Sequence, residues 1–178
     1  IGSVHSRFNM NAEEMTARVL RALEAPRLTI LGNPTGRLLL SRDPYQLDMD
    51  AVIQRAAARS VALEINADPH RLDLDWRVLP AVKRAGALVS IGADAHNIAG
   101  IDYVDFGVGI ARKGGLGPDD VLNARDLDGF TAFARKGRAR RTSAATQPPT
   151  TPRRSSGAAI PGGSSARGAA VPRRRRGT

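Results

Sequence analysis

Polar side chains that could do chemistry follow four apolar segments of the sequence, each at or just past the carboxyl end of its segment. These residues are His5, Asn33, Glu64, Asn66, Asp94 and His96. Imidazole and carboxylate groups together are ligands suited to borderline divalent metals such as Mn, Zn or Fe. The pattern therefore predicts a metal-binding site, provided that the fold brings these four ends together.

The stretch Asp94-Ala95-His96 is the most specific part of this pattern, because one turn can direct both side chains toward a single centre. A motif this short is nevertheless common, and a histidine such as His5 is more often a hydrogen-bonded structural residue. The shared position of these residues at segment ends adds weight to a functional site, and the structural alternative stays open.

Four further residues are candidates for contact with a substrate. They are Arg37, Asn66, His70 and Arg71. An arginine can hold a phosphate group through two parallel hydrogen bonds, whereas the alternative is that both arginines face solvent. His70 follows a proline in a polar loop, and a surface histidine without a function is the alternative interpretation there.

Several classes of function are disfavoured by what the sequence lacks. It has no Walker loop, no Gly-x-Gly-x-x-Gly after an expected strand and no Gly-x-Ser-x-Gly elbow, which argues against nucleotide cradling and serine hydrolysis. It has no cysteine, so disulfides and thiolate metal sites are excluded. No apolar run approaches the roughly 18 residues of a membrane span, and we expect no membrane partner.

Apolar segments alternate with amphipathic ones along the range 1–136, which predicts strands alternating with helices. The expected strands are 1–5, 28–33, 61–66 and 87–92, and the expected helices are 11–24, 48–60, 73–86, 101–112, 118–123 and 127–135. This alternation is typical of parallel sheets in α/β proteins, in which all strands end at one edge. A half-barrel and an open sheet both satisfy it.

Local signals mark the ends of some of these helices. Asn11 followed by Glu14 matches a capping box, and Asp48 or Asp50 stands near the start of the second helix. Pro80 falls within the third helix and is expected to kink it or delay its start.

Charge divides the chain into two parts. Residues 137–178 contain ten arginines and no aspartate or glutamate, so the range 1–136 holds 27 − 10 = 17 basic residues against 17 acidic ones. The basic part consists mainly of Ala, Pro, Gly, Ser, Thr and Arg and lacks aromatic residues. We therefore expect a neutral domain over 1–136 and a disordered tail over 137–178.

Several long strings resemble a known family. "SVHSRFNM", "TILGNPTGRLLL", "EINADPHRLDLDW", "DAHNIAGIDYVDFGVGIARKGGL" and "DVLN" are similar to the last part of the PHP (polymerase and histidinol phosphatase) domain of bacterial family X DNA polymerases. The similarity extends over about residues 1–136. It is closer to the polymerase-linked branch than to free-standing histidinol phosphatases.

The resemblance implies the later part of a distorted, TIM-like β/α barrel that holds a cluster of Mn or Zn ions. It also implies a metal-dependent phosphoesterase and 3′–5′ exonuclease acting on DNA in repair, in the bacterial cytoplasm and associated with the nucleoid. By position, His5, Asp94 and His96 match metal ligands of the family, whereas Asn33 stands where the family has histidine. An amide oxygen binds Mn or Zn more weakly than an imidazole nitrogen.

The family's other ligands and its polymerase domains lie upstream of the segment that this sequence matches. We therefore expect the chain to be a fragment whose metal site is incomplete until the missing half is supplied in cis or in trans. The alternative is a non-catalytic remnant that binds nucleic acid non-specifically through its arginine-rich tail. A small-molecule phosphatase is a third, less favoured interpretation.

Overall fold

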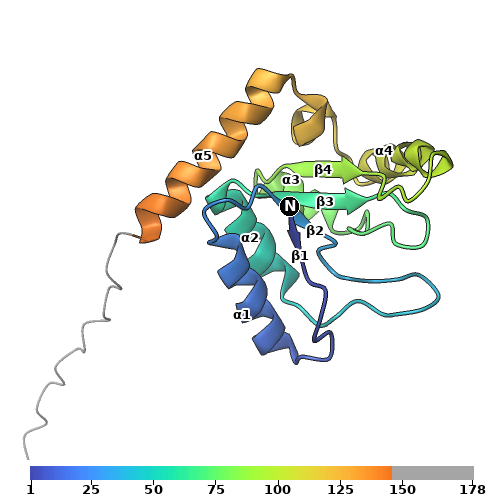
Figure 1. The fold of residues 1–178 in the computed structure, drawn as a ribbon, viewed down its shortest axis with the longest axis horizontal. Helices are drawn as coiled ribbons and strands as arrows, with labels where there is room; N and C mark the ends of the chain where they lie inside the picture. The colour runs from blue at the N-terminus through green and yellow to red at the C-terminus, as the bar shows by residue number, and fades with distance from the viewer. Residues whose placement is uncertain (146–178) are drawn as a thin grey trace, which may run out of the picture. The chain divides into compact units, whose positions relative to one another are not determined.

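The computed structural model describes residues 1–145, which form a four-stranded parallel sheet with helices packed against it (Figure 1). The strands are β1 (Gly2–Ser3), β2 (Ile30–Gly32), β3 (Ala62–Asn66) and β4 (Val89–Gly92). The α-helices are α1 (Ala12–Leu23), α2 (Met49–Arg59), α3 (Leu79–Arg84), α4 (Val104–Lys113) and α5 (Leu127–Ala145). Three 3-10 turns, η1 (Ala99–Tyr103), η2 (Pro118–Asp120) and η3 (Leu122–Ala124), complete the order.

The strands lie in the sheet in chain order, β1-β2-β3-β4, and all pairs are parallel. This is the order of neighbouring strands in a β/α barrel. The predicted α/β class and parallel sheet are confirmed. The sheet that residues 1–145 form is open, so closure into a barrel stays a prediction.

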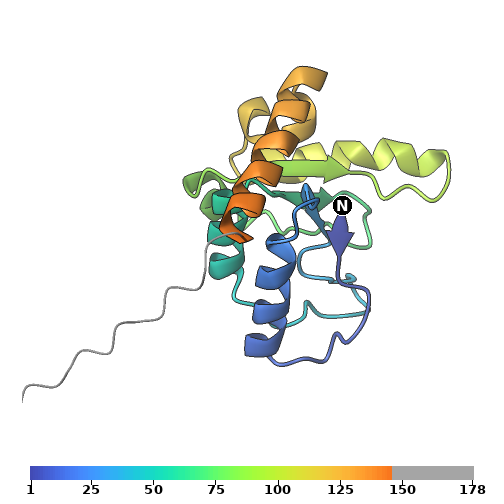
Figure 2. The same ribbon diagram turned by 60° about the vertical axis from the view of Figure 1, so that its left-hand side comes forward.

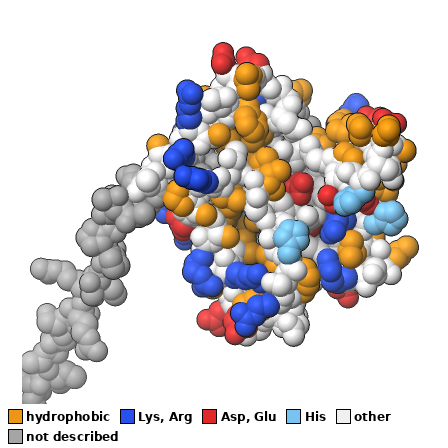
Figure 3. Space-filling view, in the orientation of Figure 1, with side chains coloured by type: hydrophobic (Ala, Val, Ile, Leu, Met, Phe, Trp, Pro, Cys, Tyr) orange, Lys and Arg blue, Asp and Glu red, His pale blue; other side chains and the backbone are white. Residues whose placement is uncertain are grey.

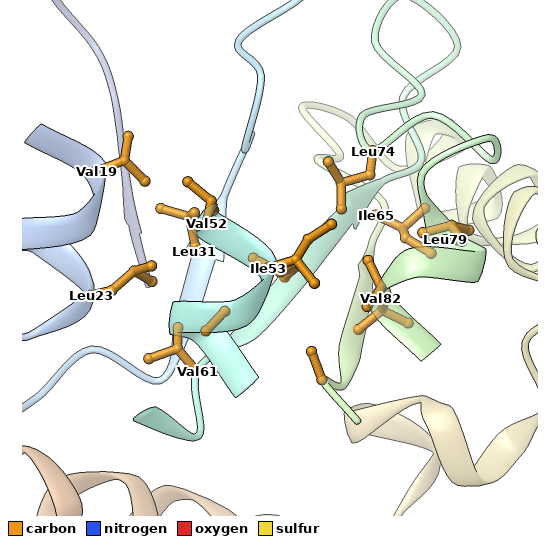
Figure 4. Packing of buried hydrophobic residues seen from close by; sticks show 14 of the residues in the cluster. Val19, Leu23, Leu31, Val52, Ile53, Val61, Ile65, Leu74, Leu79 and Val82 are labelled. Carbon is orange, nitrogen blue, oxygen red and sulfur yellow. The ribbon is translucent and has the colours of Figure 1, made fainter. Parts of the chain in front are cut away.

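One face of the sheet forms the main hydrophobic core together with the first three α-helices. Leu31 pairs with Leu63, and Leu63 pairs with Val89, which places these three side chains in one row on that face. Figure 4 shows Val19 of α1 and Leu79 of α3 among the side chains that pack there. Because these apolar side chains are almost completely buried, hydrophobic burial is the main force that holds the helices to the sheet.

The helix starts follow the local signals in all three cases, since the delayed start that Pro80 led us to expect is also observed. Asn11 accepts the Glu14 N–H at 2.9 Å, and Asp48 accepts the Ala51 N–H at 2.9 Å, so both residues are N-caps. The helix expected from residue 73 begins only at Leu79. Pro80 occupies its first turn, where a missing N–H does no harm, and residues 73–78 form a loop instead.

The other face of the sheet is covered where its strands begin and polar where they end. Ile30 and Ala62 pack against Leu122, with Phe130 and Phe133 of α5 alongside. Farther along the strands, this face carries Glu64, Asn66 and Ser90. Figures 1 and 2 both show α5 on the side where β3 and β4 begin, away from the ends of these strands.

Helix α5 extends beyond its predicted end at residue 135, so the expected boundary at 136 between domain and tail falls inside a helix. Gly137 is buried, and the Arg140 guanidinium donates to Ser60 Oγ at 3.0 Å, which fastens the added turns to the end of α2. Residues 146–178 lie outside the described part of the chain, and the disorder expected for them stays a prediction.

The outer edge of β4 is capped by a side chain. Asn123 Oδ1 accepts the Ile91 N–H at 3.0 Å, and Asn123 Nδ2 donates to the Ile91 carbonyl at 2.9 Å. The amide thus imitates one residue of a neighbouring strand and satisfies backbone groups that an edge strand leaves open. None of the helices within residues 1–145 is both long and apolar enough to cross a membrane.

Candidate functional site

The carboxyl ends of β2 and β4 each lead into a sharp turn. Asn33 follows β2 with φ of 45°, and Asp94 stands two residues past β4 with φ of 52°. Asparagine, aspartate and histidine tolerate this left-handed backbone conformation better than most residues. The turns bring both side chains to the same edge of the sheet, where β3 also ends.

Asn66, the last residue of β3, connects the three strand ends. Its side chain is completely buried and donates from Nδ2 to Asn33 Oδ1 at 3.0 Å and to Asp94 Oδ2 at 2.9 Å. Its Oδ1 accepts the Asp68 N–H at 2.9 Å. The predicted meeting of strand ends is therefore confirmed for Asn33, Asn66 and Asp94.

Glu64 lies beneath this network on the polar face of the sheet. Its carboxylate accepts the Asn33 N–H at 2.6 Å and lies close to Gly32 of β2 and Gly92 of β4. A Cβ at Gly92 would come within 2.9 Å of the Glu64 carboxylate, so the absence of a side chain there makes room for it. Burial raises the pKa of the Glu64 carboxyl, the Asn33 N–H partly offsets this, and the charge of Asp94 adds to the rise.

The loop after β2 is held by Asp73, a carboxylate that the sequence analysis did not single out. Asp73 is completely buried and accepts hydrogen bonds from the backbone N–H groups of Thr35 and Gly36, both at 3.0 Å, and from Thr35 Oγ1 at 2.9 Å. Burial raises the pKa of its carboxyl despite these bonds. No local pattern marked Asp73, because its partners Thr35 and Gly36 lie far from it in the sequence.

The two candidate arginines are both engaged by the protein rather than free in solvent. Arg37 donates to the Arg71 carbonyl at 2.8 Å, to Asp75 at 2.9 Å and to the Leu72 carbonyl, so it clamps the loop that follows β3. Arg71 Nε lies 3.3 Å from Asp94 Oδ2 at the strand-end edge. Arg71 is therefore the better placed of the two to meet a substrate phosphate, and that role stays a prediction for both.

The three histidines are exposed, and two of them lie close together in Figure 3 while the third lies apart. His5 Nε2 lies 2.7 Å from Ser3 Oγ, and His70 Nδ1 lies 2.9 Å from Asp68 Oδ1. His96 Nδ1 lies 2.6 Å from the Asp94 carbonyl oxygen, to which it must donate a proton. In the neutral ring, this leaves the lone pair on Nε2, the arrangement found in many metal-binding histidines.

The donor types suit a metal, but their arrangement does not form a complete centre. Within residues 1–145, no three His, Asp or Glu side chains gather into a group able to hold a metal ion. Asp94 is shared by Asn66 and Arg71, and His5 is bonded within its own segment. The described residues thus do not by themselves fit the metal cluster that the resemblance implies, and the ligand assignment of His5, Asp94 and His96 stays a prediction.

Comparison with known proteins gives relatives but no matching family model. The chain is 40% identical over 136 residues to the DNA polymerase/3′-5′ exonuclease PolX of Bacillus subtilis, which covers 76% of this chain and 24% of that protein. Probable phosphatases of Vibrio parahaemolyticus and Edwardsiella ictaluri are each 28% identical, over 116 and 134 residues. The chain spans 44% and 51% of their lengths and about a quarter of the Bacillus protein.

Proposed function

The chain is related to the PHP domain of bacterial family X DNA polymerases, and on that basis we propose that it supplies part of a phosphoester-hydrolysing site. The part it supplies is the edge at which β2, β3 and β4 end. The observation that carries the proposal is the hydrogen-bonded row Asn33–Asn66–Asp94 with Arg71 beside it.

The roles of the residues follow from their chemistry. Arg71 offers a guanidinium at the edge that can hold a phosphate oxygen, and Asp94 fixes its direction. His96 presents Nε2 as an acceptor, because its Nδ1 is occupied. A divalent Mn or Zn ion would supply an activated water when bound, but the described residues do not complete its site.

The proposal extends to the substrate, to the source of the remaining metal ligands and to the role in the cell. The substrate is the 3′ end of a DNA strand, where hydrolysis breaks a P–O bond and transfers the phosphoryl group to water. The remaining ligands come from the missing polymerase and PHP half, in cis or in trans. A role in DNA repair and a cytoplasmic, nucleoid-associated location belong to the proposal as well.

A chimera tests the proposal in a complete protein. The segment of the Bacillus PolX that matches this chain is replaced by the matching segment of this chain, and release of nucleotides from a 3′-labelled oligonucleotide is measured with Mn²⁺. We expect exonuclease activity that Asp94→Asn abolishes while polymerase activity, the control for folding, is unchanged. Normal polymerase activity without exonuclease activity would favour the non-catalytic remnant instead.

A substitution at Asn33, the residue after β2, adds a variant in which exonuclease activity should increase. In the chimera, Asn33→His restores an imidazole at the position where the family has histidine, and the left-handed backbone there tolerates histidine. We expect exonuclease activity to rise by about tenfold or more, since an imidazole is a far better ligand than an amide. An unchanged or lower rate would show that Asn33 does not limit the site.

A further inference from the structure

Cationic side chains gather around α5, near the amino ends of the strands, whereas the site described above lies at their carboxyl ends. They line two hollows of about 270 and 310 Å³ on the two flanks of this helix. One hollow is lined by Arg27, Arg135 and Arg138, and the other by Arg125, Lys136 and Arg140. We call these six residues the α5 basic surface.

The helix itself explains why the cations fall into two sets. Phe130 and Phe133 pack against the Ile30–Ala62–Leu122 cluster and anchor α5, and Gly137 is buried. Residues 135 and 138 are three apart and share one flank, whereas 136 and 140 are four apart and share the other. Figure 3 shows Lys and Arg side chains along the surface where α5 lies in Figure 1.

These cations have little negative charge to neutralise them. All six are exposed, and neither hollow is lined by an aspartate or glutamate. Arg140 donates to Ser60 Oγ at 3.0 Å, and Arg125 reaches the Asp119 carbonyl at 3.4 Å, so their partners are neutral. The chain continues from α5 into residues 146–178, which contain seven more arginines and no acidic residue.

The chemistry of the surface identifies its ligand. Five of its six cations are arginines, whose planar guanidinium matches the oxygens of a phosphate better than an ammonium does. Phe130 and Phe133 of α5 pack against the Ile30–Ala62–Leu122 cluster, and Leu127 is the one large apolar side chain of α5 that is largely exposed. The helix therefore does not offer the continuous exposed apolar face that a membrane-binding helix needs. We propose that the α5 basic surface binds the phosphodiester backbone of a nucleic acid strand, independently of the hydrolytic site.

The α5 basic surface and the hydrolytic site lie at opposite ends of the strands. The hollows are lined by residues that precede β2, β3 and β4, such as Thr29, Val61 and Leu88. Asn33, Asn66 and Asp94 follow the same strands at the other edge. A strand bound at α5 therefore does not occupy the site, and binding needs neither metal nor turnover.

The first test measures binding of the full chain to a fluorescent 20-nucleotide single strand and to its duplex by anisotropy, between about 50 and 300 mM salt. In Arg135→Gln/Arg138→Gln, we expect affinity for the single strand to fall on the order of tenfold at 0.1 M salt and the salt slope to shrink by about 1.4. The control, Arg21→Gln/Arg112→Gln, removes the same charge from exposed positions outside the surface and should leave the slope unchanged. Equal effects in both double variants would overturn the proposal.

Acetylation footprinting tests the location without any substitution. The chain has three lysines, Lys83, Lys113 and Lys136, and only Lys136 belongs to the α5 basic surface. We expect bound oligonucleotide to slow acetylation of Lys136 several-fold and to leave the other two unchanged. Uniform or absent protection would contradict the proposal, as would equal protection by polyglutamate of the same charge, because that would indicate an acidic polypeptide.

Asp94→Asn separates this inference from the proposed function. The substitution should leave oligonucleotide affinity and Lys136 protection unchanged, because Asp94 lies at the other edge of the sheet. Loss of hydrolysis with binding retained would leave the α5 basic surface intact as a conclusion. Loss of binding in this variant would show that the two edges are not independent.

Discussion

Asn66 and Glu64 show how single residues organise the strand-end site. Asn66 donates to two side chains from neighbouring loops and accepts one backbone N–H, so one buried amide fixes three strand ends. Glu64 accepts the N–H of Asn33 from below. The geometry of the site at this scale is set by side-chain-to-loop hydrogen bonds in a buried place, where an unmade bond is expensive.

Replacing Asn66 by alanine should destabilise the fold by about 2–3 kcal/mol, because the Asp68 N–H and the Asn33 and Asp94 acceptors lose their partner. Urea unfolding followed by the fluorescence of Trp76, the single tryptophan, measures this. Asn66→Asp is the matched variant. It can still accept the Asp68 N–H but places a negative charge beside Asp94, so its destabilisation should be smaller at acidic than at neutral pH.

Glu64 should make stability depend on pH. Its carboxyl has a pKa raised above 4.5, mainly by burial, so the folded state holds the proton more tightly than the unfolded chain does. The corresponding stability is complete below about pH 4.5 and is lost as pH rises through the raised pKa. In Glu64→Gln, we expect a shallower fall of the unfolding free energy as pH rises above about 4.5. Identical profiles would show that another group, such as Asp73, causes the fall.

At the scale of elements, side chains from other segments hold the loops after β2 and β3 and cap the outer edge of β4. Asp73 holds the loop after β2, and Arg37 holds the loop after β3. Asn123 caps the outer edge of β4. These contacts join segments far apart in the sequence, so each element depends on another for its position.

The Asn123 side chain that caps β4 should contribute measurably to the free energy of unfolding. Asn123→Ala removes both hydrogen bonds to Ile91, and we expect a loss of about 1–2 kcal/mol in the free energy of unfolding. Asn123→Asp is the control, since a carboxylate can still accept the Ile91 N–H but cannot donate to its carbonyl. It should lose less than the alanine variant, and an equal loss would assign the stabilisation to packing.

At the scale of the whole molecule, charge is segregated. The range 1–136 balances 17 basic against 17 acidic residues, and the net charge of +10 comes from the remainder. The described part of that remainder continues α5, so the basic tail starts on the folded domain rather than beyond it. Polyanion binding can therefore draw on the α5 basic surface and on residues 146–178 separately.

Deleting residues 146–178 distinguishes the two contributions. The deletion removes seven arginines and keeps every helix and strand described above. We expect weaker binding to a single-stranded oligonucleotide, with a salt slope smaller by up to about 5, but not zero. Circular dichroism and Trp76 fluorescence check that the fold persists. Unchanged affinity would show that residues 146–178 take no part in binding. Complete loss of affinity would show that the α5 basic surface does not bind the oligonucleotide by itself.

The sequence by itself determined the class of fold and the meeting of strand ends, because helix caps, apolar runs and strand–helix alternation are local patterns. It predicted that Asn33, Asn66 and Asp94 lie at the same end of the strands, but not the hydrogen bonds that join them. Pro80 indicated the delayed start of α3, but the sequence missed Asp73 as an anchor and the full length of α5. These depend on contacts between distant segments: Asp73 with the loop of Thr35, and Arg140 with Ser60. Only the tertiary structure decides such partners, since a buried polar group or a marginal helix end is stabilised by what packs against it.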